Sequence, residues 1–141
     1  MDSIRTLLVD DSREFLRAAS QFLSRDPGIE IIGKCLSSRE ALQQLGNLNP
    51  DLILMDLAMP EINGLEATKF IKDQADPPRV IILTMHDNPE YRQASQAVHA
   101  DGFVAKSDFG LELLPLIKEI FQDQLEAKGH AVPKSMVQRK R

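Results

Sequence analysis

Five short apolar segments recur along the chain, separated by longer stretches in which apolar and polar residues mix. Three of the segments are continuously apolar instead of alternating, which is typical of strands in a parallel sheet whose two faces are both covered. The pattern therefore predicts five strands: "IRTLLV" from Ile4, "IEIIGKC" from Ile29, "LILM" from Leu52, "VIIL" from Val80 and "FVA" from Phe103.

Helical patterns follow each of the expected strands. Ser12 can cap a first helix that the turn "DPG" at 26–28 ends, and a second helix covers "SSREALQQL". A third is expected from Gly64 to Gln74, and a fourth has Pro89 in its first turn. The apolar face of the first helix consists of Phe15, Leu16, Ala19, Phe22 and Leu23.

A fifth helix is expected to run to about Lys128, with a wide apolar stripe on one side. Pro115 lacks a backbone N–H and would break a helix that began at Asp108. We therefore expect ordered helix only from about Leu111 or later.

Five strands that alternate with five helices imply an α/β fold with an open, doubly wound sheet. The length of 141 residues and the 43% hydrophobic content suit one domain with one core. Cys35 is the only cysteine, so an internal disulfide is excluded. The N-terminus lacks the features of a signal peptide and no apolar run is long enough to cross a bilayer, so we expect a cytoplasmic protein without membrane contact.

Charge is distributed unevenly although the net charge is only -4. Residues 128–141 contain five Lys or Arg and no acid, which leaves residues 1–127 with 12 basic and 21 acidic residues. Basic and aromatic residues do not alternate in this tail, so a linker is a better interpretation than a nucleic-acid-binding arm. We expect a folded domain over 1–127 and a basic tail or interdomain linker over 128–141.

The predicted strand ends carry a distinctive set of polar side chains. In a parallel sheet these ends meet at one edge, where ligands bind. Carboxylates held together there favour a hard divalent cation such as Mg²⁺, and one of them could attack a phosphoryl group. For any one of these acids alone, a helix cap or a turn residue is the simpler explanation, and only the set as a whole favours a site. The set consists of Asp10 and Asp11 after the first strand, Asp56 after the third, Thr84 after the fourth and Lys106 after the fifth.

The motifs "LLVDDS", "LILMDLAMPEINGLEA", "VIILTMH" and "GFVAKSD" occur in the order found in the receiver domains of two-component response regulators, and the chain resembles this family over about residues 4–125. The resemblance implies a flavodoxin-like (βα)5 fold with strand order 2-1-3-4-5. It also implies that a sensor histidine kinase phosphorylates Asp56. The remaining roles that it implies are Mg²⁺ binding by Asp11, Asp56 and the backbone carbonyl of Ala58, a water-mediated contact from Asp10, phosphoryl contacts from Thr84 and Lys106, and inward rotation of Phe103.

"LTMHD" and "GFVAKSD" are most similar to the NarL/LuxR-type branch, whose members carry a DNA-binding domain after the receiver. The tail is too short for such a domain, so we expect either a piece of a longer regulator or a stand-alone receiver that acts through protein contacts. DNA would be reached only through the missing domain, and a second copy of the chain is a further candidate partner. We expect a switch and not an enzyme. A Mg²⁺-dependent phosphohydrolase and a passive receiver-like binding module are the alternatives, but Ala58 offers the hydrolase no second carboxylate and the passive module would be expected to have lost a site residue.

Overall fold

The computed structural model describes residues 3–122, in which five strands and five α-helices alternate along the chain. All five strands pair in parallel in the order β2-β1-β3-β4-β5, so the predicted doubly wound, flavodoxin-like sheet is confirmed. The strands are β1 (Ile4–Val9), β2 (Ile29–Cys35), β3 (Leu52–Asp56), β4 (Arg79–Thr84) and β5 (Gly102–Ala105). The helices are α1 (Arg13–Ser24), α2 (Ser38–Leu48), α3 (Gly64–Lys72), α4 (Pro89–Ala97) and α5 (Phe109–Ile120), with a 3-10 helix, η1 (Lys106–Asp108), before α5.

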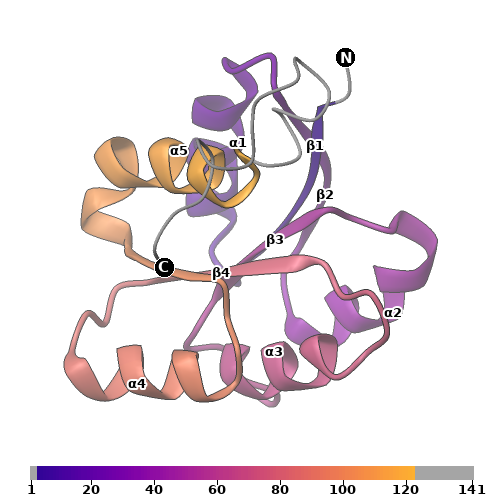
Figure 1. Cartoon of the computed structure of the whole chain (residues 1–141), viewed down its shortest axis with the longest axis vertical. Helices are drawn as coiled ribbons and strands as arrows, with labels where there is room; N and C mark the ends of the chain where they lie inside the picture. Colours follow the sequence, from indigo (N-terminus) through magenta and orange to yellow (C-terminus); the bar gives the residue numbers. More distant parts are fainter. Residues whose placement is uncertain (1–2, 123–141) are drawn as a thin grey trace, which may run out of the picture.

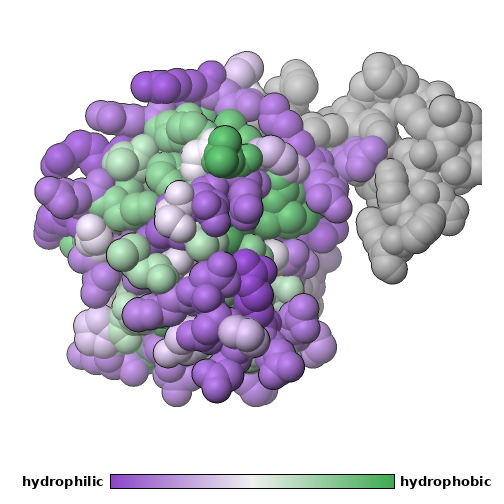
Figure 2. Space-filling view, turned by 90° about the vertical axis from the view of Figure 1, so that its left-hand side faces the viewer, coloured by the Kyte–Doolittle hydropathy of each residue, from purple (hydrophilic) through white to green (hydrophobic). Residues whose placement is uncertain are grey.

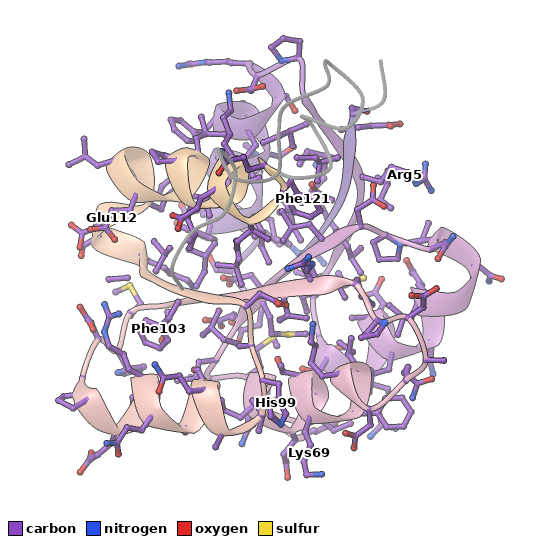
Figure 3. The ribbon with its side chains drawn as sticks, in the orientation of Figure 1. Arg5, Lys69, His99, Phe103, Glu112 and Phe121 are labelled. Carbon is purple, nitrogen blue, oxygen red and sulfur yellow. The ribbon has the colours of Figure 1, made fainter. Side chains whose placement is uncertain are left out.

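The sheet lies between two layers of helices, α1 and α5 on one face and α2, α3 and α4 on the other (Figure 1). Each face has its own hydrophobic core. Leu54 and Leu83 pack toward α1 and α5, together with Phe121 between α5 and the sheet (Figure 3), whereas Ile53 and Ile82 belong to the opposite core. Because both faces are covered, every residue of β3 is buried, which explains its continuously apolar sequence.

Side-chain caps begin four of the helices. Ser12, Ser37, Asn63 and Asn88 each accept a hydrogen bond from the backbone N–H three residues later. Pro89 occupies the first turn of α4, as predicted. The third helix ends at Lys72, two residues earlier than predicted, with Asp73 as its C-cap.

The expected start of the fifth helix was wrong. α5 begins at Phe109 and continues through Pro115. Packing outweighs the lost hydrogen bond, because Leu113 and Ile117 are fully buried and Phe109 meets two aromatic rings of α1. The carbonyl that Pro115 leaves without a helical donor belongs to Leu111, which is 81% exposed, so water can satisfy it. The predicted extension to Lys128 lies outside the described residues.

Helix α4 is the least anchored of the five. Ser95 is its only buried residue, and the Ser95 hydroxyl donates to the Tyr91 carbonyl within the helix. Polar side chains cover the lower part of the molecule in Figure 2, on the side where α4 lies, whereas apolar side chains gather above them. In residues 3–122, no helix is both long and apolar enough to cross a bilayer.

Candidate functional site

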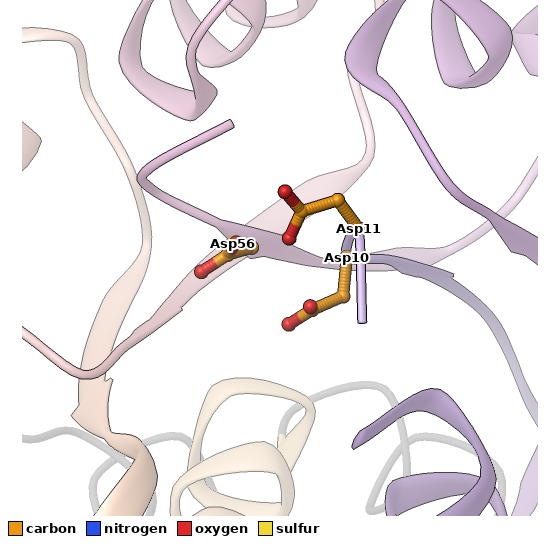
Figure 4. A group of neighbouring side chains, drawn as sticks. All are labelled: Asp10, Asp11 and Asp56. Atoms are coloured by element: carbon orange, nitrogen blue, oxygen red, sulfur yellow. The ribbon is translucent and has the colours of Figure 1, made fainter. Parts of the chain in front are cut away.

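Three carboxylates converge at the carboxyl ends of β1 and β3. Asp10 and Asp11 follow β1 directly, and Asp56 is the last residue of β3 (Figure 4). One carboxylate oxygen from each lies within 4.8 Å of the others. Asp10 and Asp56 are buried, whereas Asp11 is exposed, so the cluster opens to solvent on the Asp11 side. Such a set of hard oxygen donors suits Mg²⁺.

Lys106 brings a positive charge to the same cluster from the end of β5. Its Nζ lies 2.6 Å from Asp10 Oδ2 and 3.3 Å from Asp56 Oδ1, and its side chain is only 11% exposed. Asp10 also accepts a hydrogen bond from the Ser12 backbone N–H at 2.9 Å. One ammonium cannot balance three carboxylates, so the ionised cluster retains negative charge.

The environment of Asp56 disfavours its charged form. Burial, and after it the charge of Asp10, raises the pKa of Asp56 from 3.8 to about 6, against the opposing charge and hydrogen bond of Lys106. The negative charge of Asp11 contributes in the same direction as Asp10. An ionised Asp56 is therefore costly at neutral pH, and a cation beside it would stabilise the charged form.

Thr84 ends β4 at the same edge of the sheet and is completely buried. Its Oγ1 accepts a hydrogen bond from the His86 backbone N–H at 3.0 Å, which leaves the hydroxyl proton available to donate. Thr84 pairs with Ala105, the residue before Lys106, so its position in the sheet register is next to the acidic cluster.

The loop between β3 and α3 is packed closely against the end of β3. A Cβ on Gly64 would overlap the backbone carbonyl oxygen of Asp56, and the Gly64 N–H donates to the Leu57 carbonyl at 2.8 Å. Asn63 and Glu66 form a capping box that holds the loop at the start of α3. Ala58 lies in this loop and is exposed.

Phe103 lies on β5 and is half-buried, on the side of the molecule that also carries Glu112 (Figure 3). The guanidinium of Arg92 covers its ring at 4.6 Å from the centroid. Arg92 Nε also donates to Asp87 Oδ1 at 2.8 Å, and this hydrogen bond is the main cause of the raised pKa of Arg92, with a smaller contribution from the charge of Glu112. Arg92 thus links α4 to β5 and to the loop before α4.

The structure brings Asp10, Asp11, Asp56 and Lys106 into direct proximity and places Thr84 at the same edge. Phe103 lies on β5 three residues before Lys106, and its ring is covered by Arg92 and not by the carboxylates.

Sequence reasoning missed Arg92 and the close approach of Gly64 to Asp56. It placed Phe15 only on an apolar helix face, although the Phe15 ring lies beside Lys106. The dipeptide "NG" at 63–64 was a usable signal for Gly64, but no local pattern pointed to the other two.

Comparisons with known proteins agree with this geometry. The family profile described as "response regulator receiver domain" matches residues 6–124. The response regulator protein VraR of Staphylococcus saprophyticus is 31% identical over 123 residues, which cover 86% of this chain and 58% of that protein. A protein-glutamate methylesterase/protein-glutamine glutaminase of Nocardioides sp. is 39% identical over 84 residues, which cover 60% of this chain and 23% of that protein.

A solved structure of a LuxR-family two-component response regulator from Aurantimonas sp. has a TM-score of 0.81 and 29% identity, with 86% of this chain and 87% of that chain covered. The chain spans less than two thirds of the length of both curated relatives. The profile match, the sheet order and the acidic cluster together show that the chain belongs to the receiver domain family of two-component response regulators.

Proposed function

We propose that Asp56 accepts a phosphoryl group from the phosphohistidine of a sensor histidine kinase. The observation that carries this proposal is the placement of the Asp56 carboxylate at the open edge of the sheet, beside Asp10, Asp11 and Lys106. A carboxylate oxygen would attack phosphorus in line, so that the bond from phosphorus to the kinase's histidine nitrogen breaks and an acyl phosphate forms.

Lys106 and Thr84 are the residues proposed to receive the phosphoryl oxygens. The ammonium of Lys106 already lies 3.3 Å from Asp56 Oδ1, and the Thr84 hydroxyl has a proton to donate. Both groups would stabilise negative charge that a phosphoryl group adds to an already acidic site.

The carboxylates fit a Mg²⁺ ion, because three oxygens from three residues lie within 4.8 Å of one another. Asp11, Asp56 and the backbone carbonyl of Ala58 would hold the ion directly, with Asp10 acting through water. When bound, Mg²⁺ would neutralise the carboxylates and polarise the phosphoryl oxygens. Asp11 is the exposed member of the set, so its carboxylate is accessible to an ion from solvent.

The output part of the proposal concerns α4 and β5. Phosphorylation would draw Thr84 and Lys106 toward the new oxygens and allow Phe103 to turn inward, which shifts the weakly anchored α4. We propose that this change controls an attached DNA-binding domain, on the basis of the similarity to a LuxR-family regulator. A stand-alone receiver that acts through protein contacts, including a homodimer, is the alternative.

The proposal includes a cytoplasmic location, a receiver over 1–127 and a linker over 128–141.

Acetyl phosphate with Mg²⁺, followed by intact mass measurement, tests the acceptor. We expect one persistent phosphorylation on the parent chain, no labelling of Asp56→Asn, and labelling of the surface control Asp73→Asn. Continuous release of phosphate without a labelled species would indicate a phosphohydrolase. An unlabelled parent, or a label that maps to another residue, would contradict the proposal.

Amide exchange tests the output route separately. Beryllofluoride with Mg²⁺ should change protection most in residues 84–106, which include α4 and β5. A change confined to α1, with α4 silent, would show that the signal leaves by another face.

A further inference from the structure

The ammonium of Lys106 has a third neighbour besides its two carboxylates. Its Nζ lies over the ring of Phe15, 4.4 Å from the centroid. An ammonium within about 6 Å of an aromatic face is attracted by the negative charge of the ring's π system, and more strongly where water is excluded. The Lys106 side chain is only 11% exposed, so this contact is largely shielded from solvent.

Phe15 is itself held in place by two helices. Its ring meets the ring of Phe109 in an edge contact with centroids 5.5 Å apart, and Phe109 meets Phe22 in the same way at 5.2 Å. Phe15 and Phe22 belong to α1, whereas Phe109 begins α5. This aromatic triad therefore supports the Lys106 ammonium from the core between α1 and α5.

The three neighbours of Lys106 differ in what phosphorylation does to them. In the proposed function, on which this inference rests, Asp56 becomes the acyl phosphate and Asp10 interacts with the metal ion through water. Both carboxylates then change their interactions, and neither can hold the ammonium in a constant position. The ring of Phe15 is neutral and binds neither metal nor phosphoryl group, so its attraction for Lys106 persists throughout.

We propose that Phe15 is a positioning residue that keeps the Lys106 ammonium at the phosphoryl site while the carboxylate partners of Lys106 change. The alternative is that Phe15 only fills space between α1 and α5. Phe22 provides the comparison, because it is also a half-buried phenylalanine of α1 with one edge contact to Phe109. Among the described contacts, only the Phe15 ring lies beside the ammonium.

Three variants of the full chain test the proposal: Phe15→Leu, Phe15→Tyr and Phe22→Leu. The first readout is the second-order rate constant for phosphorylation of Asp56 by acetyl phosphate with Mg²⁺, under conditions where each variant is folded. We expect Phe15→Leu to be slower by roughly 2- to 30-fold, the range that loss of one cation–π contact implies. Phe15→Tyr should react at about the parent rate, because it keeps the aromatic ring. For Phe22→Leu the rate constant should fall by less than about twofold.

The second readout does not depend on phosphotransfer. Side-chain ¹³C relaxation of the Lys106 Cε methylene should show greater mobility in Phe15→Leu than in Phe15→Tyr or Phe22→Leu. Equal rates and equal mobility in Phe15→Leu and Phe22→Leu would reduce Phe15 to a packing role, with the proposed function intact. A parent chain that takes no label on Asp56 would instead overturn the proposed function, and this proposal with it.

Discussion

The guanidinium carbon of Arg92 lies 4.6 Å from the centroid of the Phe103 ring and covers the only aromatic side chain of β5. Phe103 is the residue proposed to turn inward when the site is phosphorylated. Arg92 comes from α4 and is tied to Asp87 in the preceding loop, so one side chain connects the elements that are expected to move. The role of Arg92 can therefore be tested on the unphosphorylated protein, without any phosphoryl donor.

Arg92→Ala should loosen the loop before α4. The variant loses the ion pair with Asp87, which holds the loop, and the cation–π contact with Phe103. The cation–π contact alone is worth about 0.5–1 kcal/mol at an exposed site, which corresponds to local opening that is roughly two to five times more frequent. We expect faster amide exchange in residues 85–92 and little change in α1. Arg17→Ala, in the opposite helical layer, is the matched control. Unchanged exchange in Arg92→Ala would mean that the contacts of Arg92 with Asp87 and Phe103 do not restrain the loop.

Asp56 should make stability depend on pH in a definite direction when Mg²⁺ is removed. Its pKa is raised to about 6, so between pH 3.8 and 6 the folded state binds more protons than the unfolded state does. The contribution of Asp56 to the free energy of unfolding therefore falls as pH rises through this range. At about 1.36 kcal/mol per pH unit, the total loss is up to about 3 kcal/mol.

Asp56→Asn lacks this titration, so its stability relative to the parent should increase between pH 4 and pH 7. Urea denaturation in EDTA at a series of pH values measures the difference. Asp73→Asn controls for the removal of an exposed carboxylate. A constant difference between Asp56→Asn and the parent across the range would contradict the burial-driven pKa shift.

Asp11→Ala should weaken Mg²⁺ binding by at least about tenfold, because a direct ligand matters at least as much as the groups that support ligands. Removal of one negative charge from the cluster should also raise the stability of the metal-free protein slightly. Isothermal calorimetry measures the first effect and urea denaturation the second. Glu14→Ala, which removes a nearby exposed acid of α1, should bind Mg²⁺ as the parent does. Equal affinity in Asp11→Ala and the parent would exclude Asp11 from the site.

Gly64→Ala should destabilise the fold by about 1–3 kcal/mol or more, because the added methyl group would overlap the backbone carbonyl of Asp56. Both clashing groups are tied to the backbone, so a side-chain rotation cannot relieve the overlap. Gly46→Ala is the matched control, since its Cβ would meet nothing within 4 Å inside α2. That variant should gain about 0.5–1 kcal/mol from helix propensity. If both variants were equally stable, the close approach at Gly64 would carry no energetic weight.

The sequence by itself determined the strands, most helix starts and the edge of the sheet that carries the acids. Continuous apolar segments such as "LILM" indicate a strand that is buried on both faces. An N-cap such as Ser12 bonds to a backbone N–H within one helical turn, so it can be recognised from the local sequence. Because parallel strands end at the same edge, the positions of Asp10, Asp56 and Lys106 in their strands were enough to predict that they meet.

Only the tertiary structure decided which side chains surround that edge and how they are held. Phe109 could begin α5 despite Pro115 because two rings of α1 receive it, and those contacts join residues far apart in the chain. The same holds for Phe15 under Lys106, Arg92 over Phe103 and Gly64 against Asp56. Local patterns record whether a residue is buried or capped, whereas the identity of its neighbour depends on strand order and on which helices share a layer, because these bring distant segments together.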